Sequence, residues 1–87
     1  MTAEYEIEFR WKEQVFYWEV ARGLYFDGGW GVTPYITYVP TAEKWAEIAP
    51  DWARERRDVI LQRLADDGPH HRLVETDLYP GKLEVSR

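Results

Sequence analysis

Arg57 is the residue whose type and position most clearly suggest chemistry in this 87-residue chain. Successive helical residues are about 100° apart, so in a helix over 50–66 Arg57 falls inside the apolar stripe that includes Ala53 and Leu64. A guanidinium held near the core could bind an acidic ligand or partner group in a bidentate fork. Alternatively, its aliphatic stem covers the stripe and its charge pairs with a carboxylate of a sheet. The pattern favours this structural ion pair, and binding remains the alternative.

A glycine-rich loop over residues 28–31 supplies the second candidate. Tryptophan is enriched at binding hot spots, so Trp30 could contact a partner, although the pattern favours a lid that folds back on the sheet. Beside the loop, Asp27 could anchor a small ligand in an aromatic pocket, and Tyr35 could lie on the sheet face opposite the core. The loop has neither the Gly-Lys-Ser/Thr of a P-loop nor the spacing of a dinucleotide fingerprint. The sequence therefore predicts no cofactor.

Metal binding and hydrolysis have little support in the sequence. His70 and His71 are the only histidines, and adjacent strand residues point to opposite faces, so they make a poor metal pair. Nearby aspartates such as Asp67 could complete only a weak oxygen-rich site. Cysteine is absent, and the sole serine, Ser86, lies in no nucleophile motif. The sequence predicts no metal site and no catalytic residue, which favours a non-catalytic protein and leaves enzymatic activity open.

The charge distribution argues against nucleic acid as a partner. The net charge is −5, and the first 43 residues hold seven acidic residues against three basic ones, whereas phosphate binding needs clustered Lys and Arg. Arg54, Arg56 and Arg63 could form a basic face on the helix, but acidic residues interleave with them, which predicts a mixed, solvated face. No apolar run approaches the roughly 20 residues that span a bilayer, and the first residues do not resemble a signal peptide. We expect a cytoplasmic protein with no membrane partner.

The elements that must position these residues are built on aromatic side chains. Thirteen of the fourteen aromatic residues lie in the first 52 residues, and most of their surface must be buried. Residues 4–11 alternate between apolar and charged side chains, which predicts a half-buried strand. A second strand over 15–22 completes a hairpin in which Phe9 and Trp18 are core neighbours, and Tyr17 then lies on the opposite face. A one-residue shift would turn the glutamates of the first strand inward, so the pattern opposes it.

The remaining segments complete an α+β fold. The predicted elements are an antiparallel sheet of four or five strands at about 4–11, 15–22, 24–27, 35–39 and 71–78, and a helical segment 42–66 that covers one face. Thr41 is a good N-cap for a short helix over 42–48, and Pro50 suits the first turn of a second helix. Residues 1–78 form one small domain, and the segment 79–87 is expected to be a loosely ordered tail. The position of strand 71–78 in the sheet stays open.

The aromatic residues on both faces of the predicted sheet bear on function. The helices can cover only one face, so a protein partner or a second copy of the chain could close the other, as in a binding or regulatory module. Alternatively, the aromatic side chains could wall a small-ligand pocket or a minor active site. A third possibility is a structural domain whose aromatic residues are simply its core. The binding module, with a homodimer as one form of it, is the function that the sequence favours.

Overall fold

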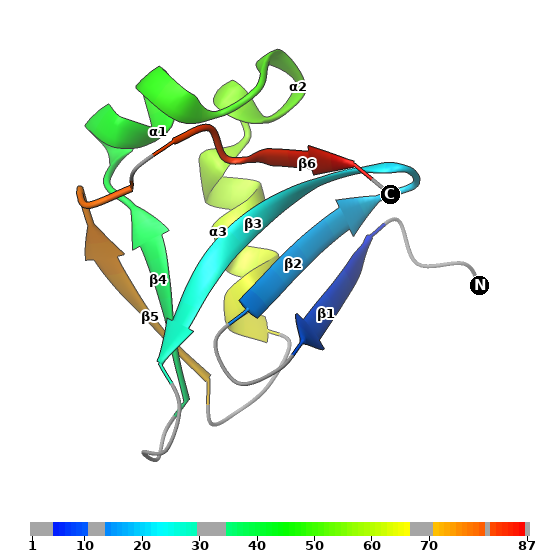
Figure 1. The fold of residues 1–87 in the computed structure, drawn as a ribbon, viewed down its shortest axis with the longest axis vertical. Helices are drawn as coiled ribbons and strands as arrows, with labels where there is room; N and C mark the ends of the chain where they lie inside the picture. Colours follow the sequence, from blue (N-terminus) through cyan, green and yellow to red (C-terminus); the bar gives the residue numbers. More distant parts are fainter. Residues whose placement is uncertain (1–4, 11–13, 30–34, 67–70, 80, 87) are drawn as a thin grey trace.

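The computed structural model describes residues 5–10, 14–29, 35–66, 71–79 and 81–86 (Figure 1). Its elements follow in the order β1 (Glu6–Arg10), β2 (Gln14–Glu19), β3 (Arg22–Gly29), β4 (Tyr35–Pro40), α1 (Ala42–Ile48), α2 (Asp51–Arg54), α3 (Arg57–Asp66), β5 (His71–Thr76) and β6 (Glu84–Ser86). The strands form one sheet in the order β1-β2-β3-β4-β5, and β6 pairs with β3. Figure 1 shows α3 lying across the sheet, with α1 and α2 at one end. The predicted α+β fold with a largely antiparallel sheet and a helical cover is confirmed.

The sheet departs from the prediction at β4 and β5, which pair in parallel. All three helices lie between these two strands in the chain. A connection of this length can return to the same end of the sheet, which a parallel pair requires and a tight turn cannot supply. The helical segment therefore decides the direction of β5, and the described sheet has one strand more than the prediction allowed.

The core lies between the sheet and the helices. Tyr17, Leu24 and Phe26 face it from β2 and β3, and Ile60 and Leu64 face it from α3. All five side chains are fully buried. Burial of such side chains is the main source of folding free energy in a chain of this size. The apolar stripe expected on the helix is thus the stripe that packs on the sheet.

The register of the first hairpin differs from the predicted pairing. Ile7 lies opposite Tyr17, and Phe9 lies opposite Val15. Tyr17 therefore faces the core, while Trp18 faces the other side of the sheet, so the prediction that Phe9 and Trp18 are core neighbours is wrong. Phe9 is exposed. The register is shifted by one residue from the prediction, but the glutamates do not turn inward: Ile7 still packs against the core, and it is β2 that presents its other face.

Contacts on the outer face of the sheet explain this register. Trp18 is only 3% exposed although the helices cover the opposite face. Its ring lies on Gly23, where a Cβ atom would be 2.4 Å from the indole, and it stacks on Phe16 with ring centroids 5.6 Å apart. The indole Nε1 donates a 2.9 Å hydrogen bond to Glu8 Oε1. A glutamate on this face is therefore a hydrogen-bond acceptor for an aromatic side chain, which the alternation alone does not reveal.

The helical segment is interrupted close to its middle. The predicted N-cap is confirmed, because Thr41 Oγ1 accepts a 3.3 Å hydrogen bond from the backbone N–H of Lys44. The second predicted helix, however, is divided into α2 and α3 by the two residues Glu55 and Arg56. This interruption places Arg56 directly before α3, where its carbonyl accepts a 3.0 Å hydrogen bond from the N–H of Ile60.

The C-terminal segment differs from the loosely ordered tail that we expected. Tyr79 and Leu83 are buried in the core, and β6 pairs with β3 so that Val85 lies opposite Gly23. Leu83 N also donates a 3.2 Å hydrogen bond to Ile48 O. A strand of three residues is too short to show a period of two, which is why the sequence pattern missed it.

Candidate functional site

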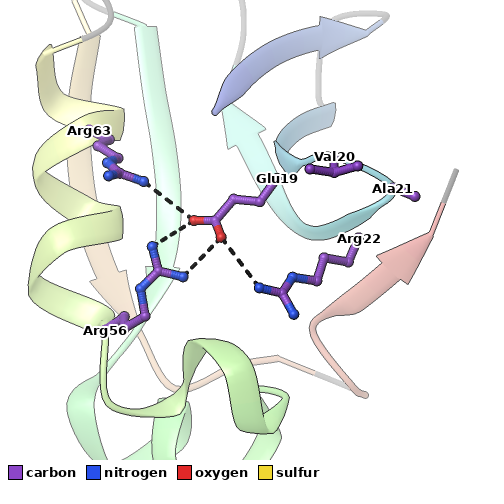
Figure 2. Close-up of a pocket in the computed structure, with 6 residues that line it drawn as sticks. All are labelled: Glu19, Val20, Ala21, Arg22, Arg56 and Arg63. Atoms are coloured by element: carbon purple, nitrogen blue, oxygen red, sulfur yellow. Dashed lines mark hydrogen bonds and ion pairs between the residues drawn. The ribbon is translucent and has the colours of Figure 1, made fainter. Parts of the chain in front are cut away.

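An open pocket of about 590 Å³ lies where the turn between β2 and β3 meets the helical segment (Figure 2). It is lined by Glu19, Val20, Ala21, Arg22, Arg56 and Arg63, and we call it the arginine pocket. Glu19 ends β2 and Arg22 begins β3, so the two-residue turn forms one wall. Arg56 lies directly before α3 and Arg63 lies within it, and both side chains point toward Glu19 (Figure 2).

A single carboxylate, that of Glu19, is the centre of the arginine pocket. Arg56 binds it in a bidentate manner, with Nη1 2.9 Å from Oε1 and Nη2 2.8 Å from Oε2. Arg63 Nη1 lies 3.3 Å from Oε2, and the Tyr17 hydroxyl donates a 2.5 Å hydrogen bond to the same oxygen. Arg22 Nη2 is 3.9 Å from Oε1, an ion pair without a direct hydrogen bond. Three guanidinium groups thus surround one carboxylate.

This environment determines the protonation of Glu19 and Tyr17. Burial by itself raises the pKa of Glu19, but hydrogen bonds from Arg56 and Tyr17 and the charges of Arg56 and Arg63 outweigh it and hold the pKa below its ordinary value of 4.5. Burial and the hydrogen bond to Glu19 raise the pKa of Tyr17 to about 12. At neutral pH Glu19 is therefore a carboxylate, and Tyr17, which is buried behind it, is a neutral phenol.

The lining of the arginine pocket has more positive than negative side chains. It contains three arginines and one glutamate, whereas the whole chain carries a net charge of −5. Glu19 is the most buried of the four, with 11% of its side chain exposed, and Arg22 is the most exposed, at 55%. The positive charge that an incoming molecule meets most directly is therefore that of Arg22.

Aromatic rings hold two of the guanidinium groups in place. Arg22 lies over the Trp52 ring at 4.7 Å from its centroid, and Trp52 Nε1 donates a 3.1 Å hydrogen bond to Glu84 Oε2. Arg63 lies over the Tyr5 ring, also at 4.7 Å. Such contacts are favourable and restrict the arginine rotamers. The donors of the pocket are thus positioned before any ligand binds.

The turn at the rim of the arginine pocket is strained. Val20 has φ 61°, the only positive φ among the non-glycine residues that the structure describes. A β-branched residue is disfavoured in this left-handed region, and the first loop residue of a two-residue hairpin is a position that favours glycine. The Val20 side chain is also 88% exposed. A strained, exposed apolar side chain therefore stands beside a cluster of positive charge.

The structure places Arg57, the first predicted site residue, outside the arginine pocket. Arg57 Nη2 donates 2.9 Å hydrogen bonds to Glu75 Oε1 on β5 and to the carbonyl of Pro40 on β4. The expected ion pair with a sheet carboxylate is confirmed. Its Nε atom is buried without a hydrogen-bond partner in the described part of the chain. Whether Arg57 also binds a ligand is a separate question that this ion pair does not answer.

Among the other predicted site residues, Asp27 is the one whose side chain the structure describes. Asp27 lies on β3, where its carboxylate accepts a 2.8 Å hydrogen bond from the Tyr25 hydroxyl and its N–H donates a 3.3 Å hydrogen bond to the Tyr79 hydroxyl. Tyr35 begins β4, and its side chain lies outside the described part of the protein. Trp30 also lies outside the described residues. Asp27 and Arg57 are absent from the lining of the arginine pocket.

Sequence reasoning missed the four charged residues of the arginine pocket as a site. The sequence predicts Arg56 and Arg63 on a mixed, solvated face, and the strand that contains Glu19 is predicted with Trp18, not Tyr17, toward the core. The seven-residue spacing of Arg56 and Arg63 was the available signal. This spacing alone does not predict a site, because the carboxylate of Glu19 is 37 residues from Arg56 and 44 residues from Arg63 in the chain.

Comparison with protein-family models, curated proteins and solved structures gives no significant match. Among the described residues, no helix has the length and apolar character needed to cross a membrane. The same part of the chain contains no group of three or more His, Cys, Asp or Glu side chains that could hold a metal ion. The function is therefore inferred from the geometry of the arginine pocket.

Proposed function

We propose that this protein is a non-catalytic binding module that recognises an acidic group of a protein partner through the arginine pocket. The observation that carries the proposal is the convergence of Arg22, Arg56 and Arg63 on a single carboxylate in an open pocket. A balanced ion pair requires only one arginine. The exposed guanidinium of Arg22 can attract an incoming anion.

The protonation states in the pocket favour binding over catalysis. A general acid or base works best when its pKa lies near the pH at which the protein acts. The pKa of Glu19 is lowered by its arginine partners, and that of Tyr17 is raised to about 12. Neither group is therefore poised to exchange a proton at neutral pH. Both instead hold the guanidinium groups in position.

The shape of the pocket favours a group presented by a larger molecule. Small-ligand sites enclose most of their ligand and are lined mainly by apolar side chains. The arginine pocket is open, four of its six lining residues are charged, and its exposed apolar residue, Val20, stands at the rim. There it can contact the surface that carries the acidic group. A small anionic ligand is the second candidate, because a volume of about 590 Å³ would accommodate one.

A second copy of the chain is one such partner. The chain is acidic overall, with a net charge of −5, so another copy can offer a carboxylate to the pocket. Sedimentation of the purified protein at low and high ionic strength separates this case from that of a different partner. The cytoplasmic location expected from the sequence is part of the same proposal, and cell fractionation tests it.

The experiment that tests the proposal is a ¹⁵N–¹H NMR titration with a short polyglutamate peptide at low ionic strength. We expect shifts at the pocket residues, weaker binding at higher salt, and a clear loss of affinity in Arg22→Gln. Arg22 suits this test because its side chain is largely exposed and makes no direct hydrogen bond to Glu19.

Arg54→Gln is the matched control. The Arg54 side chain is about as exposed as that of Arg22, but it pairs with Asp51 and with the carbonyl of Ala49 outside the pocket. Its replacement should leave the titration unchanged. Shifts that avoid the pocket, or that persist unchanged in Arg22→Gln, would contradict the proposed function.

A further inference from the structure

We infer that the arginine pocket binds Asp77 and Leu78 of a second copy of this chain, so that copies associate head to tail. This inference rests on the proposed function and names the partner of the same site. Two surfaces take part in the contact. One is the β2–β3 turn at the pocket, with Val20 and Arg22, and the other is the segment that follows β5.

The two surfaces are complementary in charge and in apolar character. Val20 and Leu78 are the most exposed large apolar residues in the described part of the chain, at 88% and 83%. An exposed base, Arg22, lies two residues from Val20, and an exposed acid, Asp77, directly precedes Leu78. A contact between the two surfaces would pair the charges and remove both apolar side chains from water.

The backbone at Val20 supports a role outside the single chain. The pairing of Glu19 with Arg22 leaves two loop residues between them, and Val20 is the first. A positive φ at the first loop residue alone is the pattern of a type II′ turn, which favours glycine there. Because the residue is also 88% exposed, packing within the chain does not explain a valine at this position. Strained residues cluster at functional sites, and contact with a second copy would give this side chain its role.

Asp77 and Leu78 are held in place from both ends. On one side, Thr76 ends β5, and its Oγ1 accepts a 3.2 Å hydrogen bond from the N–H of Leu78. On the other side, Tyr79 is buried, and its hydroxyl accepts a 3.3 Å hydrogen bond from the N–H of Asp27. The exposed pair between these two residues is therefore presented by a restrained backbone, so less conformational entropy is lost when it binds.

The two surfaces lie on opposite sides of the molecule. Figure 1 shows the β2–β3 turn at the right of the sheet and the segment after β5 at the left. Within the sheet, β3 and β4 separate β2 from β5. The contact therefore forms between copies and not within one chain. Because two different surfaces meet, each pair of copies keeps one surface of each kind free to bind a further copy.

The experiment measures self-association of the full chain by sedimentation velocity over a range of concentrations. The pocket variant combines Val20→Thr with Arg22→Gln, and the segment variant combines Asp77→Asn with Leu78→Ser. We expect the wild-type protein to form oligomers that grow with concentration, and each variant alone to associate at least about tenfold more weakly. Arg54→Gln, an exposed arginine outside the pocket, is the control and should associate like the wild type.

A mixture of the two variants tests the head-to-tail arrangement directly. The segment variant keeps an intact pocket, and the pocket variant keeps Asp77 and Leu78. One complementary pair of surfaces therefore remains, and we expect a one-to-one complex with no larger species.

The outcomes separate the inference from the proposed function. A wild-type protein that stays monomeric, variants that associate like the wild type, or a mixture without a one-to-one complex would overturn the inference. The proposed function stands in those cases if the polyglutamate peptide still shifts the pocket residues and its binding depends on Arg22. If the peptide does not bind at the pocket either, both are overturned.

Discussion

Arg56 and Arg57 are neighbours in the chain, yet their side chains serve two different regions of the molecule. Arg57 pairs with Glu75 on β5, one positive charge with one negative, and also donates to the carbonyl of Pro40. Arg56 joins Arg22 and Arg63 around Glu19, three positive charges with one negative. The first arrangement matches one charge with one charge, although the buried Arg57 Nε has no hydrogen-bond partner in the described part of the chain. The second brings three guanidinium groups to one carboxylate, and this is the arrangement that we propose as the binding site.

Burial separates the two carboxylates as clearly as charge does. The side chain of Glu19 is 11% exposed, whereas that of Glu75 is 62% exposed. A buried carboxylate must be matched by partners, and losing it leaves those partners uncompensated. An exposed one interacts weakly, because water screens its charge. The two regions should therefore respond very differently to the same substitution.

The largest effect is expected from Glu19→Gln. This change removes the charge that three guanidinium groups share, and breaking a buried ion pair by removing one partner costs about 3–5 kcal/mol. Because Arg22 is partly exposed and can turn to solvent, we expect a loss near the lower end, about 3 kcal/mol. Urea unfolding followed by tryptophan fluorescence measures it. A loss below about 1 kcal/mol would show that Glu19 is as peripheral as Glu75.

Acid should destabilise the protein through the same carboxylate. Glu19 has a lower pKa in the folded state than its ordinary value of 4.5, so the unfolded chain takes up the proton more readily. Its contribution to stability is complete above that value and is lost as the pH falls through the folded-state pKa. Urea unfolding from about pH 7 down to about pH 3 measures this loss, which should be smaller in Glu19→Gln. Parallel pH profiles for the two proteins would contradict the account of Glu19.

The strained turn at the rim of the pocket is a place where a substitution should stabilise the protein, whereas Glu19→Gln should destabilise it. Val20→Gly should relieve the left-handed conformation and raise the free energy of unfolding by about 1 kcal/mol, since strain of this kind costs about 1–3 kcal/mol and glycine is more flexible when unfolded. Thermal unfolding checks it. Ala21→Gly, at the neighbouring turn residue without positive φ, is the control and should not stabilise the protein. Destabilisation by Val20→Gly would show that the turn is not strained.

The smallest effect is expected from Glu75→Gln. Its ion pair with Arg57 is largely exposed, and Arg57 retains the carbonyl of Pro40 as an acceptor. We expect the free energy of unfolding to change by about 0.5 kcal/mol or less. A loss as large as that of Glu19→Gln, measured by the same urea unfolding, would remove the distinction between the two regions.

The sequence predicted well what local patterns determine. The Thr41 cap, the apolar stripe of the helical segment and the pairing of Arg57 with a sheet carboxylate all agree with the structure. The cap and the stripe depend on residues that are close together in the chain. The prediction for Arg57 required only that its guanidinium have a carboxylate of the sheet as its partner, without naming which one. Periodicity and capping preferences are sufficient for them.

The sequence could not determine features that depend on distant contacts. Tyr17 and Trp18 are both large and aromatic, so alternation alone could not decide which of them faces the core. Gly23 and Glu8, which accommodate Trp18 on the outer face, decide it in the structure. The arginine pocket is a stronger case, because Glu19 and Arg63 are 44 residues apart and meet only when α3 packs on the sheet.

The most direct test of the account compares the two regions in one binding measurement. The polyglutamate peptide is titrated against Arg22→Gln, which alters the arginine pocket, and against Arg57→Met, which removes the ion pair with Glu75. We expect a clear loss of affinity for the first variant and wild-type affinity for the second. Equal losses in both variants, or a loss only in Arg57→Met, would contradict the claim that the arginines around Glu19 form the binding site.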